Sequence, residues 1–101
     1  MNSNTIGPGL APAHEYLSQD QLADRLATAQ QQVMAGARYM HYKQHIYKVL
    51  AVALLEADNE PCVVYQAEYG EAVTWVRPVS SWMQTVTVDG KTVPRFTKLD
   101  A

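Results

Sequence analysis

The sequence contains one cysteine, no long apolar run and no excess of basic residues among its 101 residues. Because Cys62 stands alone, it cannot form an internal disulfide or the thiolate-rich zinc sites of many small domains. We expect it to be a small buried side chain in a strand. No stretch approaches the roughly 20 apolar residues of a membrane-spanning helix, and the N-terminus lacks the features of a secretory signal. These absences predict a cytoplasmic protein without a membrane anchor.

The charge balance limits the classes of partner. Eight Lys and Arg residues stand against ten Asp and Glu residues, which gives a net charge of −2 with neutral histidines. Proteins that bind nucleic acid or membrane surfaces generally carry a basic excess. A nucleic-acid partner is therefore not expected, although a local basic patch stays open. The hydrophobic fraction of 48% is enough for one small core in a chain of this length.

The N-terminal third divides into a tail and a helix. Residues 1–16 are rich in Asn, Gly, Pro and Ala without apolar periodicity, which predicts a disordered tail. An amphipathic helix is expected over residues 17–35, where Ser18 and Gln21 form a capping-box pattern. Its narrow apolar stripe consists of Leu22, Leu26, Ala29 and Val33. This stripe could pack on the same chain or on its copy in a homodimer, and the sequence leaves both open.

From residue 37 onward the apolar period changes from that of a helix to that of strands. Runs of Val, Tyr, Trp and Thr alternate with turn signals, of which Asp89-Gly90 is the clearest because Gly accepts the positive φ of a tight hairpin turn. The strands expected are 38–43, 46–55, 62–69, 73–77, 84–88 and 92–96. We predict a mainly β fold, in which residues 37–97 form a small SH3-like antiparallel barrel after one N-terminal α-helix.

The segment RYMHYKQHIYKV, residues 38–49, is predicted to form the first hairpin, with Gln44 and His45 as its turn. On one face His41, Lys43 and Lys48 would form a polar edge beside Tyr39, Ile46 and Leu50, so that face is mixed. The core face would consist of Met40, Tyr42, Tyr47 and Val49. In this geometry the two histidines are more than ~10 Å apart and lie beside lysines, so no metal site is expected.

Trp75 and Arg77 share one face of a predicted strand, close to Tyr69 at the end of the preceding one. The indole could hold the guanidinium by stacking and leave its planar fork free for a carboxylate or phosphate. The more ordinary role is an internal ion pair of Arg77 with Glu68 or Glu71. Both roles stay open, since a ligand could displace the pair.

A series of short motifs between residues 37 and 97 resembles a small, mostly bacterial family, domain of unknown function 1653. The motifs are His41-Tyr42-Lys43, Tyr47 with Val49, Val63-Val64-Tyr65, Tyr69-Gly70, Trp75-Val76-Arg77-Pro78, Val88-Asp89-Gly90-Lys91 and Val93-Pro94-Arg95-Phe96. The resemblance implies a compact β domain, an SH3-like barrel, with no agreed activity. Gln44 stands where the family usually has Gly, Leu55 or Glu56 where it often has His, and Ser81-Trp82 where it has Met-Phe.

Together these residues favour a non-catalytic binding module for an acidic or aromatic-stacking ligand or a peptide, with an unidentified small molecule or protein as partner. The binding residues expected are His41, Lys43, Tyr69, Glu71, Trp75 and Arg77. One alternative is a structural protein that self-associates through its helix. Another is a small enzyme with His41 as general base beside Glu68 or Glu71, although no nucleophile set or glycine-rich phosphate loop can be assembled. No cofactor is expected.

Overall fold

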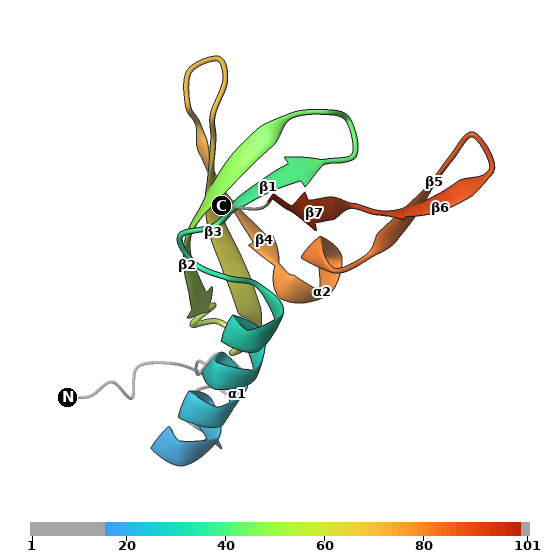
Figure 1. The fold of residues 1–101 in the computed structure, drawn as a ribbon. Coiled ribbons are helices and arrows are strands. Elements are labelled where there is room, and N and C mark those ends of the chain that lie inside the picture. Colours follow the sequence, from blue (N-terminus) through green and yellow to red (C-terminus); the bar gives the residue numbers. More distant parts are fainter. Residues whose placement is uncertain (1–15, 100–101) are drawn as a thin grey trace.

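The computed structural model describes residues 16–99, in which a helix packs on the larger of two β-sheets (Figure 1). The elements in chain order are α1 (Gln19–Gln32), β1 (Arg38–His41), β2 (Ile46–Leu54), β3 (Pro61–Ala67), β4 (Thr74–Pro78), α2 (Val79–Trp82), β5 (Thr85–Val88), β6 (Lys91–Pro94) and β7 (Phe96–Lys98). The predicted tail, residues 1–16, lies outside the described residues except for Tyr16. Neither helix in the described part of the chain has the length and apolar character to span a membrane.

The capping box predicted at the start of α1 is formed. Gln21 donates its backbone N–H to Ser18 Oγ at 3.0 Å, and Ser18 donates its own to Gln21 Oε1 at 2.8 Å. The helix ends at Gln32, three residues before the predicted end at 35, because Val33 already has an extended backbone with φ −133°. Ala29 and Val33 are buried in the core beside strands of the same chain. The apolar stripe of the helix therefore packs on its own sheet.

The main sheet has five antiparallel strands in the order β4-β3-β2-β1-β7, and β5 and β6 form a separate two-stranded sheet. That second hairpin projects away from the main sheet (Figure 1). Its turn is the predicted one, with φ +50° at Asp89 and +80° at Gly90, as a two-residue hairpin loop requires. The mainly β fold after one helix is confirmed. Within residues 16–99 the sheets do not close on each other, so the expected SH3-like barrel is not confirmed.

The predicted register of the first hairpin is wrong. Met40 faces Ile46 rather than Val49, a shift of three residues. Because an odd shift turns every side chain of a strand to the other face, Tyr39 is buried in place of Met40. Tyr42 lies in the turn and not in the core.

A wider turn causes this shift. His41 donates its backbone N–H to His45 O at 2.8 Å, which encloses a loop of three residues rather than the predicted two. Within the loop Gln44 has φ +75°, a left-handed conformation that favours glycine. The sequence has no glycine at this position, so the usual signal for such a turn is missing.

Aromatic side chains join the C-terminal elements to the sheet. Trp82 of α2 stacks on Phe96 of β7, with ring centroids 3.6 Å apart, and Tyr39 and Tyr65 meet Trp82 edge-on at 5.2 and 4.9 Å. The segment after Pro78 forms this short helix, and the predicted strand 92–96 is divided into β6 and β7, which extends beyond it to Lys98. The short helix and β7 are stabilised by contacts between residues distant in the chain.

Candidate functional site

A shallow pocket of about 230 Å³ opens on the face of the main sheet that carries the aromatic side chains. Its lining residues are Tyr47, Tyr65, Tyr69, Trp75 and Arg77. Tyr65 on β3 lies directly opposite Trp75 on β4, and Tyr69 follows in the turn between these strands. Trp75 is 51% exposed and Tyr69 43% exposed. The predicted aromatic residues thus border an open hollow and do not lie beneath α1.

The guanidinium of Arg77 is held by neutral oxygen atoms. Nε donates to the hydroxyl of Tyr65 at 3.3 Å and Nη1 to Oγ of Ser81 at 2.9 Å. The group lies over the ring of Phe96, 5.6 Å from its centroid, and not on the Trp75 indole as predicted. Three residues therefore fix the orientation of the Arg77 side chain: Tyr65 of β3, Ser81 of α2 and Phe96 of β7.

The predicted ion pair of Arg77 with Glu68 or Glu71 is not formed. Glu68 instead accepts from Arg38, with Nη2 and Oε1 2.8 Å apart. Glu68 lies on the opposite face of the sheet from Arg77. Side chains alternate between the two faces along β3, and Tyr65 shares the face of Arg77, whereas Val64, Gln66 and the following Glu68 do not. Glu71 is an exposed residue of the β3–β4 turn. The alternation of side chains along the predicted strand could have excluded Glu68 as the ion-pair partner of Arg77. Glu68 lies an odd number of residues from Tyr65, which shares the face of Arg77.

Two tyrosine hydroxyls form one rim of the pocket. Tyr47 Oη and Tyr69 Oη are 2.6 Å apart, and the ring of His45 stacks on that of Tyr69 with centroids at 4.4 Å. Burial and the hydrogen bond to Tyr69 raise the pKa of Tyr47 to about 12. Tyr47 therefore stays protonated at neutral pH and fixes the otherwise exposed Tyr69 ring in position.

His41 lies among aromatic rings and cations. Its ring is edge-on to Phe96 at 5.0 Å, and its Nδ1 accepts the backbone N–H of Lys43 at 3.1 Å. Burial lowers the pKa of His41, and the positive charges of Arg77, Arg95 and Lys43 lower it further. The neutral ring at pH 7 therefore carries its proton on Nε2, because Nδ1 is the acceptor.

The surroundings of His41 add no support for the general base predicted there, and that role stays a prediction. The available lone pair of the neutral ring points at a backbone amide, and the charges that act on it are positive. A base in a catalytic pair is normally oriented by a carboxylate, but Glu68 is bound to Arg38. No group of three or more His, Cys, Asp or Glu side chains within the described ranges is placed to hold a metal ion.

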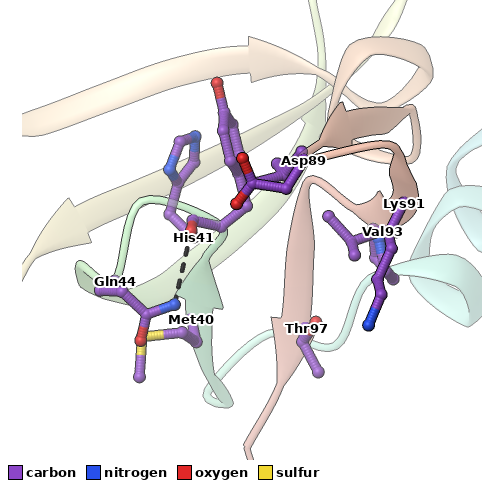
Figure 2. A pocket seen from close by; sticks show the side chains of 10 residues that line it. Met40, His41, Gln44, Asp89, Lys91, Val93 and Thr97 are labelled. Atoms are coloured by element: carbon purple, nitrogen blue, oxygen red, sulfur yellow. Dashed lines mark hydrogen bonds between the residues drawn. The ribbon is translucent and has the colours of Figure 1, made fainter.

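A second and larger hollow, of about 430 Å³, lies between the first hairpin and the β5–β6 hairpin. Figure 2 shows Met40, His41 and Gln44 on one side of it and Asp89 and Lys91 on the other. The remaining lining residues are Tyr42, Val88, Val93, Pro94 and Thr97. This hollow has one acidic and one basic side chain from the β5–β6 hairpin, whereas the smaller pocket is lined by one cation and four aromatic rings.

The structure brings half of the predicted site together. Tyr69, Trp75 and Arg77 line the aromatic pocket, whereas His41 on β1 lines the larger hollow. Lys43 and Glu71 are exposed turn residues that line neither hollow. Sequence reasoning missed Tyr47, Tyr65 and Ser81. For Tyr65 a signal existed, because it shares one face of the predicted strand 62–69 with Tyr69.

The comparisons with known proteins agree with the motifs in the sequence. A family model described as "Protein of unknown function (DUF1653)" matches residues 37–98. The chain belongs to this family. A crystal structure of a DUF1653 protein from Bordetella bronchiseptica is similar to it, with a TM-score of 0.61 and 30% sequence identity, covering 67% of this chain and 90% of the other. No curated protein matches the chain. The predicted family of the domain is confirmed, and the DUF1653 description assigns it no activity.

Proposed function

We propose that this DUF1653 domain is a non-catalytic binding module whose aromatic pocket takes an anionic ligand that carries a flat ring, such as a nucleotide or an aromatic acid. The observation that carries the proposal is that Arg77 lines one pocket together with two exposed aromatic side chains, Trp75 and Tyr69. A cation beside exposed rings is suited to a ligand with both an acidic group and a π-face.

The aromatic side chains provide stacking surface that is already in place. Tyr69 is fixed by the hydroxyl of Tyr47 and by the ring of His45, so little side-chain entropy is lost when a ligand stacks on it. Trp75 leaves about half of its surface in water, at 51% exposure. Stacking of a base on one aromatic side chain contributes about 1–3 kcal/mol, so two rings are sufficient for a specific site.

The charges around the pocket favour an anion although the chain as a whole is acidic. The positive charges of Arg77, Arg95 and Lys43 lower the pKa of His41, which supports an excess of positive charge around that ring. The bonds of Arg77 to Tyr65 and Ser81 occupy Nε and Nη1. Within residues 16–99 its Nη2 makes no hydrogen bond, and an oriented guanidinium of this kind binds a carboxylate or phosphate oxygen with little reorganisation.

The experiment is an NMR titration of the full chain with phenyl phosphate, which combines a ring with an anion. The chain has two tryptophans, and a Trp75→Phe variant assigns their indole signals. We expect the Trp75 indole and the amides near Tyr69 to shift on titration. Inorganic phosphate, which has no ring, and benzyl alcohol, which has no charge, should each bind at least about tenfold more weakly, since each lacks one of the two interactions.

The matched variants are Trp75→Ala and Val73→Ala. Both side chains are exposed and close together on the chain, at 51% and 43%, but Val73 does not line the pocket. Trp75→Ala should weaken phenyl phosphate binding by about tenfold or more, and Val73→Ala should leave it unchanged. The proposal is wrong if phenyl phosphate shifts no signal of the pocket, or if it binds the Trp75→Ala variant as tightly as the wild type.

A further inference from the structure

The two outer strands of the main sheet differ in their protection. β7 has three residues and carries the charged Lys98. β4 has five residues, with 51% of Trp75 and 61% of Val76 exposed, and its own charge and proline, Arg77 and Pro78, stand at its C-terminal end. Proteins usually shorten, charge or cover an edge strand, because its unpaired backbone groups pair readily with another strand. No strand within residues 16–99 pairs with the outer side of β4. The edge of β4 therefore has the properties of an interaction surface.

The hydrogen-bond pattern identifies which residues of β4 point toward this edge. Ala67 donates its N–H to Val73 O at 3.0 Å in the same register as the β3–β4 ladder. In an antiparallel pair, hydrogen-bonded and non-hydrogen-bonded positions alternate. Counting from Val73, the backbone groups of Trp75 and Arg77 point toward β3.

The alternate residues, Thr74, Val76 and Pro78, point their backbone groups outward. Pro78 fits this assignment, because proline has no N–H to donate and is tolerated in a strand where its nitrogen faces the open edge. Val76 is then the central residue of β4 with an N–H and a C=O directed away from the sheet. Its side chain lies on the opposite face from Trp75 and Arg77.

We propose that β4 pairs with β4 of a second copy of the chain, antiparallel and with the two-fold axis at Val76. In this register Val76 faces its own copy in a hydrogen-bonded position, and Trp75 of each chain faces Arg77 of the other. The Trp75 and Arg77 positions are non-hydrogen-bonded, where opposed Cα atoms are only about 4.5 Å apart. The Trp75 indole of each chain then lies beside the Arg77 side chain of the other, and the two main sheets become one continuous sheet.

Other registers of the β4–β4 pair are less favourable. Moving the axis to Arg77 would oppose two guanidinium groups directly, which is unfavourable. Moving it to Trp75 would pair Arg77 with Val73, outside the strand, and leave Pro78 beyond the end of the partner. The axis at Val76 sets each of the five residues of β4 opposite a residue of the partner, with Trp75 opposite Arg77. Because Pro78 has no N–H, each Thr74–Pro78 pair keeps one of its two hydrogen bonds. The same axis also places Arg77 of the second copy beside the Trp75 that borders the aromatic pocket.

Sedimentation velocity of the full chain over a range of concentrations tests the proposal. The wild type should show a monomer–dimer equilibrium. Val76→Asp sets two carboxylates opposite each other at the axis and should weaken dimerisation by about tenfold or more. Val88→Asp, an exposed valine of the β5–β6 sheet, is the matched control and should dimerise as the wild type does. Circular dichroism establishes that both variants are folded. A wild type that is monomeric at its highest soluble concentration, or a Val76→Asp variant that dimerises normally, overturns the proposal.

Cysteine cross-linking tests the register. Val76→Cys places two thiols on opposed residues about 5.5 Å apart between Cα atoms, which a disulfide spans. Thr74→Cys places them about 13 Å apart along the strands, so it should not cross-link. The native Cys62 is buried. Oxidation should therefore convert only the Val76→Cys variant to a covalent dimer, and cross-linking at 74 without cross-linking at 76 rules the register out.

Discussion

The ring of Trp82 lies flat on the ring of Phe96, with centroids 3.6 Å apart and planes 3° from parallel. Trp82 belongs to the short helix α2 after β4, and Phe96 begins β7, the strand that pairs with β1. Both side chains are buried, at 2% and 8% exposure. This contact joins the C-terminal segment to the core, and Phe96 in turn supports the guanidinium of Arg77.

Trp82→Ala should cost about 3–5 kcal/mol in the free energy of unfolding, since it empties a buried site at the centre of the aromatic cluster. Trp75→Ala, which removes the same type of side chain from an exposed position, should cost about 1 kcal/mol or less. Urea unfolding followed by circular dichroism measures both. Equal losses in the two variants would show that the stacked pair does not organise the core.

Gln44→Gly should stabilise the domain by about 0.5–1 kcal/mol, because residue 44 has φ +75° and only glycine adopts this conformation without a steric cost. The side chain makes one long hydrogen bond, from Nε2 to Tyr42 O at 3.4 Å, so little is lost with it. Gln44→Ala keeps the strained backbone and should not be stabilised. Thermal midpoints of the two variants, measured together, separate backbone strain from loss of the side chain.

Stability should fall as the pH falls through about 6.5, the ordinary pKa of histidine, because of His41. Its pKa in the folded protein is lowered from 6.5, by burial and nearby cations. Below pH 6.5 the unfolded chain therefore binds more protons than the folded one, and acid favours unfolding until the folded state is protonated too. His41→Gln should reduce this slope, measured as the change in urea midpoint with pH. His45→Gln is the control and should retain it.

Arg77→Ala should cost about 1–3 kcal/mol in stability as well as weakening anion binding, because it leaves Ser81 Oγ and the Tyr65 hydroxyl without their donor. Arg77→Lys retains a cation but loses the planar fork, and should recover part of the binding. Thermal shift and the phenyl phosphate titration are read together. Loss of stability without any loss of binding would assign Arg77 to the fold alone.

Local signals in the sequence located most elements. The capping box of Ser18 and Gln21 marked the start of α1, and Asp89-Gly90 marked the β5–β6 turn. In both places two residues near each other in the sequence provide the hydrogen bonds or the backbone conformation that the structure requires. The predicted register of the first hairpin was wrong because such a local signal was absent there. Gln44 adopts a conformation that usually needs glycine, and the resulting shift exchanged Met40 for Tyr39 in the core.

What the sequence determined by itself was the family, the helix, the change to strand periodicity and the burial of Cys62, since each depends on residue types at short spacing. Tertiary structure decided the rest. Only packing across the sheet placed Arg77 on Phe96 and bound Glu68 to Arg38, because contacts between residues far apart in the chain leave no local pattern. The open edge of β4 is likewise a property of the strand order, which residues 74–78 do not encode alone.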